Sequence, residues 1–345
     1  MIESVNRQNQ KDPMKKCVVI LSLLLVAGSI LLSGCSKSKT AATSSGNPAN
    51  GSATSAGSVT SDQPVDMKIK WTVGRTYPMR LELSQSTKTD VPNQPQPVVQ
   101  EVKLTQGFDF SALKQLDNGG YQLELKFGNE TMNVSQGGNT VVSFDSTQSQ
   151  AQEADNPVTP VLRAMIGARI EYFTDANGKV ERMEGVNELA QRVAATGKPQ
   201  AQATFQQMFS ADTLKRYGSF ADAMPGHPVS VGDSWPFQEE VSTAIGVLKV
   251  DMKYTFKNWE QFRGRQCAHV NAEGNISTKT ISTANGMAVQ IEKSRITGEF
   301  WYDPSLGMMV ELNNDQNMTM KIETRAQNMT SQFNQTIRMA LVDTQ

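Results

Sequence analysis

Residues 121–127, YQLELKF, alternate apolar and polar side chains at every position. This period-two pattern is typical of a β-strand with one face in water and the other in a core. Residues 79–83 (MRLEL) and 250–256 (VDMKYTF) show the same alternation. The sequence DNGG at 117–120 separates residues 108–116 from the opening strand and predicts a tight turn. These patterns predict an antiparallel sheet.

The middle of the chain changes to the 3.6-residue period of helices. Asn156-Pro157 predicts a capping residue followed by proline at the first helical position, and apolar residues then recur at helical spacing. The same spacing predicts a second helix around 186–193, a third around 205–209 and a fourth that opens at Ser210. We therefore expect a helical section over about 156–224, which turn-forming residues close.

Two strand-rich parts of the chain resemble each other. Residues 74–77 (GRTY) open the first part and 232–235 (GDSW) open the second, each as a turn into a strand that begins with an aromatic residue. Near their ends, residues 171–180 and 300–309 each lead an aromatic strand into a turn with aspartate and glycine. We predict an α+β fold, predominantly antiparallel β-sheet, formed by a duplicated β-module with a central helical insertion.

The amino-terminal segment has the features of an export signal. Residues 17–32 are apolar and follow Lys15 and Lys16. This apolar run is shorter than the about 20 residues that span a membrane stably, so it predicts a signal peptide. The alternative is an uncleaved membrane anchor, which would also place the rest of the chain outside the cytoplasm. Met14 is a better start for such a signal than Met1, because residues 1–13 are polar.

The predicted export signal ends in a short motif that contains a cysteine. Leu32-Ser33-Gly34-Cys35 resembles the lipobox of bacterial lipoproteins. This resemblance implies that Cys35 is lipidated through its sulfur and acylated at its new amino terminus after cleavage. More than one acyl chain is needed for stable anchoring. The residue after Cys35 is serine rather than aspartate, which by resemblance to enterobacterial sorting rules predicts the outer membrane. We expect a lipid-anchored protein of the bacterial cell envelope.

Composition divides the remainder into a linker and a folded part. Residues 36–66 are rich in Ser, Ala, Thr and Gly and carry almost no large apolar side chain. Such a segment predicts a flexible tether, which reaches on the order of 30 Å. The predicted organisation is a signal peptide at 1–34, the lipidated cysteine and linker at 35–66, and a β-rich globular domain at 67–345.

Charge and cysteine content argue against nucleic-acid binding and against an internal disulfide. Residues 1–34 carry four basic and two acidic residues, so their removal leaves 29 basic against 32 acidic residues, a net charge of −3. This balance gives no electrostatic reason to bind nucleic acid. Only Cys35 and Cys267 remain in the mature chain, so a lipidated Cys35 leaves no pair for an internal disulfide. The expected partner is the membrane, and we expect no cofactor.

Several short segments together carry a family resemblance. They are residues 74–77 at the start of a strand, the Asn156-Pro157 helix that ends at residues 166–167, the turn at 178–180 that leads into residues 185–189, residues 224–225, the sequence PVSVGDSW at 228–235, and residues 298–307. On these residues the chain resembles an uncharacterised family of bacterial lipoproteins, known as domain of unknown function 6263. The resemblance covers nearly all of residues 67–345. It implies a lipoprotein architecture and supplies no activity.

The candidate metal ligands are Cys267 and His269. They lie two apart on a predicted strand and so share one face. A tetrahedral site needs more ligands, and no CxxC or HxxxH pair supplies them. We therefore expect a buried thiol beside a packed imidazole, and no metal.

Other candidate residues have a simpler explanation as turns. His227 is flanked by proline and glycine, and Ser234 does not match the Gly-x-Ser-x-Gly elbow of a hydrolase. The segment Asp175 to Gly178 begins like a calcium loop but lacks the later ligands, so a hairpin turn explains it better. We assign no catalytic residue.

Methionine gives the last hint about function. The chain from Cys35 onwards has fifteen methionines, of which Met308, Met318 and Met320 lie close together near its end. Methionine fills cores and also lines adaptable apolar pockets. We expect a non-enzymatic binding or structural module of the envelope, with an envelope protein or hydrophobic ligand as a further partner. The alternative is a periplasmic carrier of a lipid or other hydrophobic ligand, and an envelope hydrolase is third.

Overall fold

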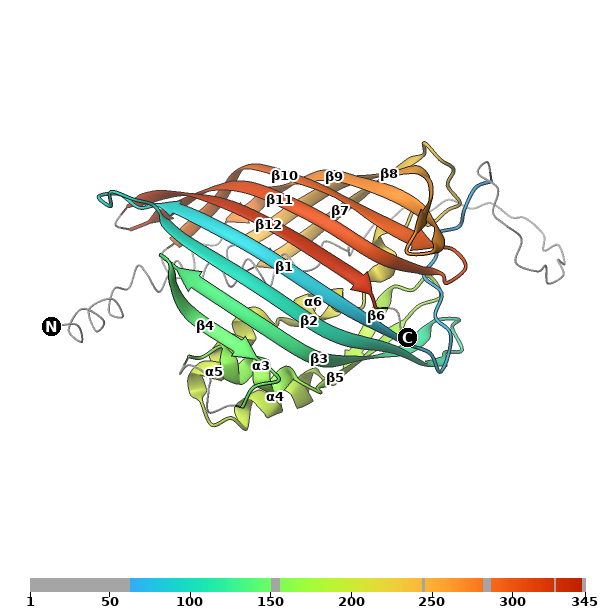
Figure 1. Cartoon of the computed structure of the whole chain (residues 1–345), viewed down its shortest axis with the longest axis horizontal. Coiled ribbons are helices and arrows are strands. Elements are labelled where there is room, and N and C mark those ends of the chain that lie inside the picture. Colours follow the sequence, from blue (N-terminus) through green and yellow to red (C-terminus); the bar gives the residue numbers. More distant parts are fainter. Residues whose placement is uncertain (1–62, 150–155, 244–245, 282–286, 326, 343–345) are drawn as a thin grey trace.

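Most of the described residues form one antiparallel sheet of twelve strands (Figure 1). The computed structural model describes residues 63–149, 156–243, 246–281, 287–325 and 327–342. The predicted signal peptide, the proposed start at Met14, Cys35 and most of the linker lie outside the described residues. The predicted antiparallel α+β fold is confirmed.

Strands account for most of the described elements, and short helices occupy the middle of the chain. The strands are β1 (Thr76–Asp90), β2 (Val98–Gln115), β3 (Tyr121–Gln136), β4 (Asn139–Asp145), β5 (Arg169–Thr174), β6 (Val180–Glu184), β7 (Ser234–Thr243), β8 (Gly246–Phe262), β9 (Arg265–Ile281), β10 (Met287–Asp303), β11 (Met308–Thr324) and β12 (Asn328–Leu341). The helices are α3 (Thr159–Met165), α4 (Val186–Ala194), α5 (Pro199–Met208), α6 (Ala211–Tyr217) and the 3-10 helix η2 (Phe220–Ala223). Within the described ranges, no helix has the length and apolar character needed to cross a membrane.

Strand order reveals the duplication. Along the sheet the order is β6-β5-β3-β2-β1-β12-β11-β10-β9-β8-β7. Two sets of five strands, β6 to β1 and β11 to β7, each run across the sheet in reverse chain order. Strand β12 lies between the two sets and pairs with β1 and β11. In the first set β4 and β5 both pair with β3, with α3 between them, and take the place of the single long β10. The two parts therefore form one continuous sheet.

The turns that open the two parts have matching backbone contacts. Gly74 N donates to Ala112 O and Gly232 N donates to Phe256 O, both at 2.8 Å. Both glycines have positive φ, 81° and 95°, which a side chain would disfavour. The weak similarity between residues 74–77 and 232–235 therefore reflects one repeated structural element.

The two late hairpins also match. Asp175 Oδ1 accepts a hydrogen bond from Lys179 N at 2.8 Å in the β5–β6 turn, and Asp303 Oδ1 accepts one from Ser305 N at 2.8 Å in the β10–β11 turn. Glycines with positive φ, at Gly178 and Gly307, complete these turns. The hairpin turn predicted at Asp175 to Gly178 is confirmed. The Asp175 side chain accepts a backbone hydrogen bond within the turn, and Gly178 has the positive φ that the turn needs.

The helical section begins slightly later than predicted. Asn156 Oδ1 accepts hydrogen bonds from Val158 N and Thr159 N, at 2.9 and 3.0 Å, so this side chain does bind the start of α3. The helix itself begins at Thr159, and Pro160 rather than Pro157 lies in its first turn. The predicted start of α6 at Ser210 is confirmed, because Ser210 Oγ accepts from Thr213 N at 3.1 Å.

The segment before β1 packs against the start of the sheet. Val65 pairs with Val229, so the fold begins before the predicted Met67, because the last apolar residue of the linker already joins a bridge. Trp71 then packs its ring on Tyr77 and Phe220, at centroid distances of 5.1 and 6.0 Å. This aromatic contact covers the inner face where β1 begins.

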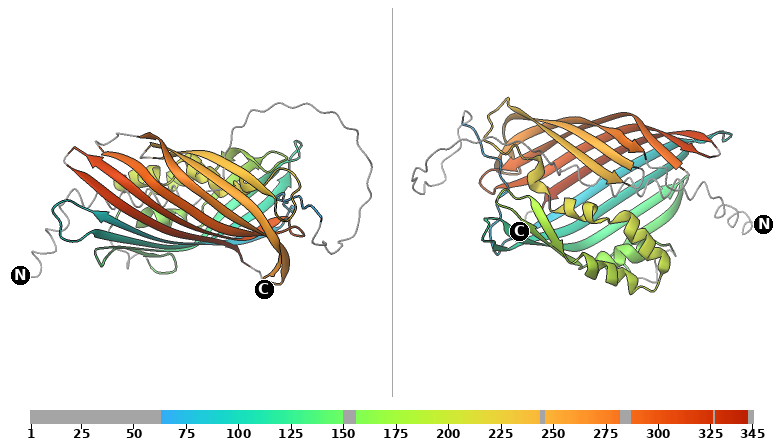
Figure 2. Two further views of the ribbon diagram at one scale, coloured as in Figure 1. Left: turned by 90° about the horizontal axis from the view of Figure 1, so that it is seen from above. Right: turned by 180° about the vertical axis from the view of Figure 1, so that it is seen from behind.

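Helix α6 connects strands that are far apart in the sheet. Tyr172 on β5 donates a hydrogen bond to Leu214 O at 2.8 Å, and Arg216 forms an ion pair with Glu239 on β7 at 3.3 Å. Because β5 and β7 lie near opposite edges of the sheet, these contacts require it to curve around the helix. Figure 2 shows this curvature, with the helices on the inner side.

Candidate functional site

A row of amide side chains crosses the inner face of the sheet. It spans five neighbouring strands, β3, β2, β1, β12 and β11, and we call it the amide stripe: Gln136, Gln100, Gln85, Gln335, Gln316 and Asn314. Backbone register places Gln335 directly opposite both Gln85 and Gln316. Directly opposed residues have Cβ atoms about 4.5–5.5 Å apart, so Gln85, Gln335 and Gln316 are neighbours, and so are Gln100 and Gln136. Gln100 lies opposite Thr87 on β1 and is therefore a diagonal neighbour of Gln85.

Strand alternation fixes which face carries the stripe. On β1 the buried positions are every second residue, and Gln85 continues the series that contains Tyr77, Leu81 and Leu83. Tyr77 contacts Trp71 on the inner side, so Gln85 points to the same side. Gln85, Gln100, Gln316 and Gln335 are at most 3% exposed, whereas glutamine is ordinarily a surface residue.

The stripe is short of hydrogen-bond partners. Both amide atoms of Gln100 and of Gln316 have no partner within the described part of the chain, and the same holds for Gln335 Oε1 and Asn314 Oδ1. The Nε2 atom of Gln335 does have one, since it donates to Gln85 Oε1 at 3.2 Å. An unsatisfied buried polar group costs about 1–3 kcal/mol, and such groups are rare in native proteins. The stripe thus has more buried donors and acceptors than the described part of the chain pairs.

Apolar side chains flank the amides on the same face. Met318 and Met320 follow Gln316 at alternate positions of β11, and Phe333 precedes Gln335 by two on β12. All three apolar side chains are buried, and so is Met308 at the other end of β11. Of the three methionines singled out from the sequence, Met318 and Met320 therefore lie beside the stripe. The inner face combines amide and apolar surface there.

A second polar cluster, nearer to α6, is fully paired. Gln106 Nε2 donates to Glu130 Oε2 at 3.1 Å, and Tyr217 donates its hydroxyl hydrogen to Gln106 Oε1 at 3.2 Å. Burial raises the pKa of Glu130 to about 8, against the weaker opposing effect of the Gln106 hydrogen bond. Burial likewise raises the pKa of Tyr217 above its ordinary value. In this cluster, unlike in Gln100 and Gln316 of the stripe, both amide atoms of Gln106 form hydrogen bonds.

Cys267 and His269 lie side by side on the outer face of β9, as their spacing predicts. Cys267 is fully buried, and burial raises the pKa of its thiol to about 12. The His269 ring stacks on Trp301 at 4.9 Å, and its Nε2 lies 3.1 Å from Glu299 Oε2. In the described residues no group of three or more His, Cys, Asp or Glu side chains is placed to hold a metal ion.

The other candidate residues occupy turns. His227 is exposed and its Nδ1 lies 3.1 Å from Pro228 O. Ser234 begins β7, where its Oγ is 2.9 Å from Thr255 Oγ1. The described contacts bring His269 to carboxylates and an indole ring, and they bring Ser234 to another hydroxyl. The structure does not assemble these residues into one site.

Sequence reasoning missed the amide stripe. The signal for it was present, because glutamine takes the place of an apolar residue in the buried series of β1, β2 and β12. A single such glutamine is unremarkable in a sequence. Only the cross-strand register shows that these positions meet.

Comparison with known protein families identifies one family whose sequence model matches this chain. The sequence model of a family described as "Family of unknown function (DUF6263)" matches residues 118–328. The chain belongs to this family. The match runs from the turn before β3 to the first residue of β12, so the matched part of this DUF6263 chain includes the described helices and most of the strands. The resemblance to this family is thereby confirmed, and the match leaves out residues 74–77, on which the resemblance was also based.

Other comparisons with this DUF6263 chain find only remote similarity. No curated protein matches its sequence. Lipovitellin shares 8% identity with a TM-score of 0.39 over 80% of this chain, which spans about a quarter (26%) of the lipovitellin chain. A putative exported protein with a YmcC-like fold from Bacteroides fragilis shares 9% identity over 79% of this chain and 96% of its own, with a TM-score of 0.23. OccK5 (OpdH) from Pseudomonas aeruginosa shares 5% identity over 79% of this chain and 100% of its own, with a TM-score of 0.25. Similarities this low carry no information on function.

Proposed function

We propose that this protein is a non-enzymatic binding protein, anchored in the bacterial cell envelope through lipidated Cys35, that holds an amphipathic small molecule on the inner face of its sheet. The observation that carries the proposal is the amide stripe. Several of its buried amide atoms have no partner in the described chain, and they come from neighbouring strands. A ligand with hydrogen-bonding groups would remove the cost of leaving them unpaired.

The surroundings of the stripe support an amphipathic ligand over a purely polar one. Met318, Met320 and Phe333 are buried beside the amides and would contact an alkyl or ring portion. Ligand sites are typically lined by apolar side chains with a few polar groups that fix orientation. Methionine adapts its shape to varied apolar partners, which suits a lipid chain. The ligand class is therefore an amphiphile with an uncharged hydrogen-bonding part, because the stripe carries amides and no charge.

The state of the potential nucleophiles supports a binding role over an enzymatic one. Burial raises the pKa of the Cys267 thiol to about 12, so it is protonated at neutral pH and a poor nucleophile. Ser234 Oγ lies against Thr255 Oγ1 at 2.9 Å, and His269 lies against Glu299. A hydrolase would need a histidine oriented towards a nucleophile. These contacts favour the binding and carrier readings over the hydrolase.

Native mass spectrometry of the full chain tests the proposal. We expect wild-type protein purified from bacteria in mild detergent to retain a non-covalent ligand in stoichiometric amount. Gln316→Leu removes an amide that bonds to no described residue, so it should lower ligand occupancy by roughly tenfold. The covalent acyl chains on Cys35 stay attached in both proteins and do not interfere.

A neighbouring residue gives the matched control. Gln332 lies on β12, three residues before Gln335, and is exposed on the opposite face. Gln332→Leu should keep full occupancy. In the absence of ligand, Gln316→Leu should be at least as stable as wild type, because an unpaired buried amide is replaced by an apolar group. Equal occupancy in wild type and Gln316→Leu, or no ligand in either, would contradict the proposal.

A further inference from the structure

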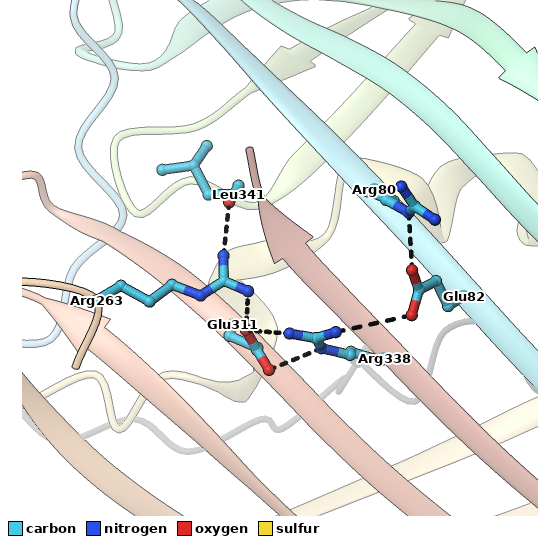
Figure 3. Close-up of polar contacts among 6 residues, drawn as sticks. All are labelled: Arg80, Glu82, Arg263, Glu311, Arg338 and Leu341. Carbon is cyan, nitrogen blue, oxygen red and sulfur yellow. Dashed lines mark hydrogen bonds and ion pairs between the residues drawn. The ribbon is translucent and has the colours of Figure 1, made fainter. Parts of the chain in front are cut away.

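The outer face of the sheet carries a pocket that is distinct from the amide stripe. Its volume is about 320 Å³, and it lies where β1 begins and β12 ends. Three arginines dominate its lining, together with one glutamate and the last described residues of the chain: Arg80, Arg263, Arg338, Glu82, Ala340, Leu341 and Val342. Figure 3 shows Arg80 from β1, Arg338 from β12 and Arg263 from the β8–β9 turn in a row of ion pairs, with Glu82 between Arg80 and Arg338 and Glu311 between Arg338 and Arg263.

A buried carboxylate fixes two of the three arginines. The side chain of Glu311 on β11 is only 5% exposed. It accepts two hydrogen bonds from Arg338, at 2.8 and 3.1 Å, and its Oε2 lies 2.5 Å from Arg263. Arg338 also lies 3.8 Å from Glu82. The guanidinium groups are therefore held in position before any ligand arrives, which reduces the cost of binding.

The cluster has an excess of positive charge. Three arginines face two carboxylates, Glu82 and Glu311, so one positive charge is not balanced within it. Arg80 contacts Glu82 through Nε at 2.8 Å, so its two terminal nitrogens take no part in this ion pair. Arg80 is also 57% exposed, so these donors are available to a ligand from solution.

The backbone at Arg263 supports a role for its side chain. Arg263 has φ of 49° and Gly264 has φ of 72°, the geometry of a two-residue hairpin turn. Asparagine or glycine is normally found at the first of these positions, and a long side chain there is strained. The Arg263 guanidinium spans from this turn to Leu341 O, at 3.1 Å, and to Glu311. The strained backbone therefore lies at the residue whose side chain lines the pocket.

We propose that this pocket binds an oxyanion, a phosphate group that is either free or the headgroup of a lipid. Guanidinium groups bind phosphate through paired, charge-assisted hydrogen bonds, and the site has both the spare donors and the excess charge. The 44% exposed Val342 offers an apolar surface next to it, which suits a lipid. The proposal is independent of the ligand on the inner face.

Calorimetric titration of the full chain with two probes tests this site. The probes are inorganic phosphate and 1,2-dihexanoyl phosphatidate, which add the same charged group without and with acyl chains. We expect saturable binding of at least one probe, weakened about tenfold or more by Arg80→Gln, since a hydrogen bond to a charged group contributes about 1.5–3 kcal/mol. Equal affinities identify free phosphate as the ligand, and tighter phosphatidate binding identifies a lipid headgroup.

The control variant carries the same change of charge elsewhere. Arg295 is exposed on β10 and does not line the pocket, so Arg295→Gln should leave the affinity unchanged. Arg80 touches only an exposed partner, so its variant should unfold at the same urea concentration as wild type. No binding of either probe, or equal weakening by Arg80→Gln and Arg295→Gln, would overturn the proposal.

Discussion

Glu239→Gln is expected to lower the free energy of unfolding by about 3–5 kcal/mol, the range for breaking a buried ion pair from one side. The side chains of Arg216 and Glu239 are 6% and 2% exposed and lie 3.3 Å apart. Glutamine keeps the shape of glutamate but removes the negative charge opposite a buried guanidinium. Because this pair joins α6 to β7, its loss weakens the contact that holds the sheet in its curved form. Urea unfolding followed by tryptophan fluorescence measures the change.

The next residue on the same strand is the control. Glu240 points to the opposite face, where its side chain is 52% exposed and pairs with Lys279. Exposed pairs contribute little to stability, so Glu240→Gln should have a far smaller effect. Replacing both Arg216 and Glu239 with leucine should restore much of the lost stability, since no unpaired charge then remains. Similar losses for Glu239→Gln and Glu240→Gln would show that the buried pair does not close the sheet.

The free energy of unfolding is also expected to fall as the pH rises from about 4.5 to about 8, because of Glu130. Burial raises the pKa of Glu130 to about 8 in the folded chain, against an ordinary value of 4.5. Between these values the folded chain keeps a proton that the unfolded chain releases, so each rise in pH favours unfolding. The stability that comes from protonated Glu130 is fully present below its ordinary pKa of 4.5 and is lost as the pH rises through its folded-state pKa of about 8. At about 1.4 kcal/mol for each pH unit between the two pKa values, the largest loss is roughly 5 kcal/mol.

Glu130→Gln removes the titrating group and keeps the hydrogen-bonding shape. This variant should lack that part of the pH dependence and should be more stable than wild type at pH 8 and above. Glu101 is exposed on β2, and Glu101→Gln should retain the wild-type slope. Urea unfolding at several pH values separates the two results. Parallel stability profiles for wild type and Glu130→Gln would show that Glu130 ionises normally in the folded protein.

Local sequence patterns were enough to predict most strands and helices. Alternation identified residues 121–127 and 250–256, which lie in β3 and β8, and helical spacing identified α4, which buries Leu189 and Val193. Strand β12 escaped notice because Gln335 interrupts its apolar series between Phe333 and Ile337. The period-two signal depends on apolar residues, so a buried amide weakens it.

Long-range pairing could not be predicted in this way. The two strand-rich parts form one sheet because β1 pairs with β12, for example Met79 with Leu341, across almost the whole folded chain. Pairing between such distant segments leaves no local trace in the sequence. The amide stripe and the arginine pocket both depend on this junction, since Gln85 and Arg80 lie on β1 while Gln335 and Arg338 lie on β12. Both sites therefore became visible only in the fold.

The most direct test of the central claim is to locate the ligand on the protein. The chain would be produced with photo-methionine, illuminated with its native ligand bound, and digested for peptide mass mapping. The ligand should crosslink to the β11 peptide that contains Met318 and Met320, which lie beside Gln316 on the inner face. Crosslinks confined to other methionines, such as Met183 on the edge strand β6, or no crosslink at all, would contradict a ligand bound at the amide stripe.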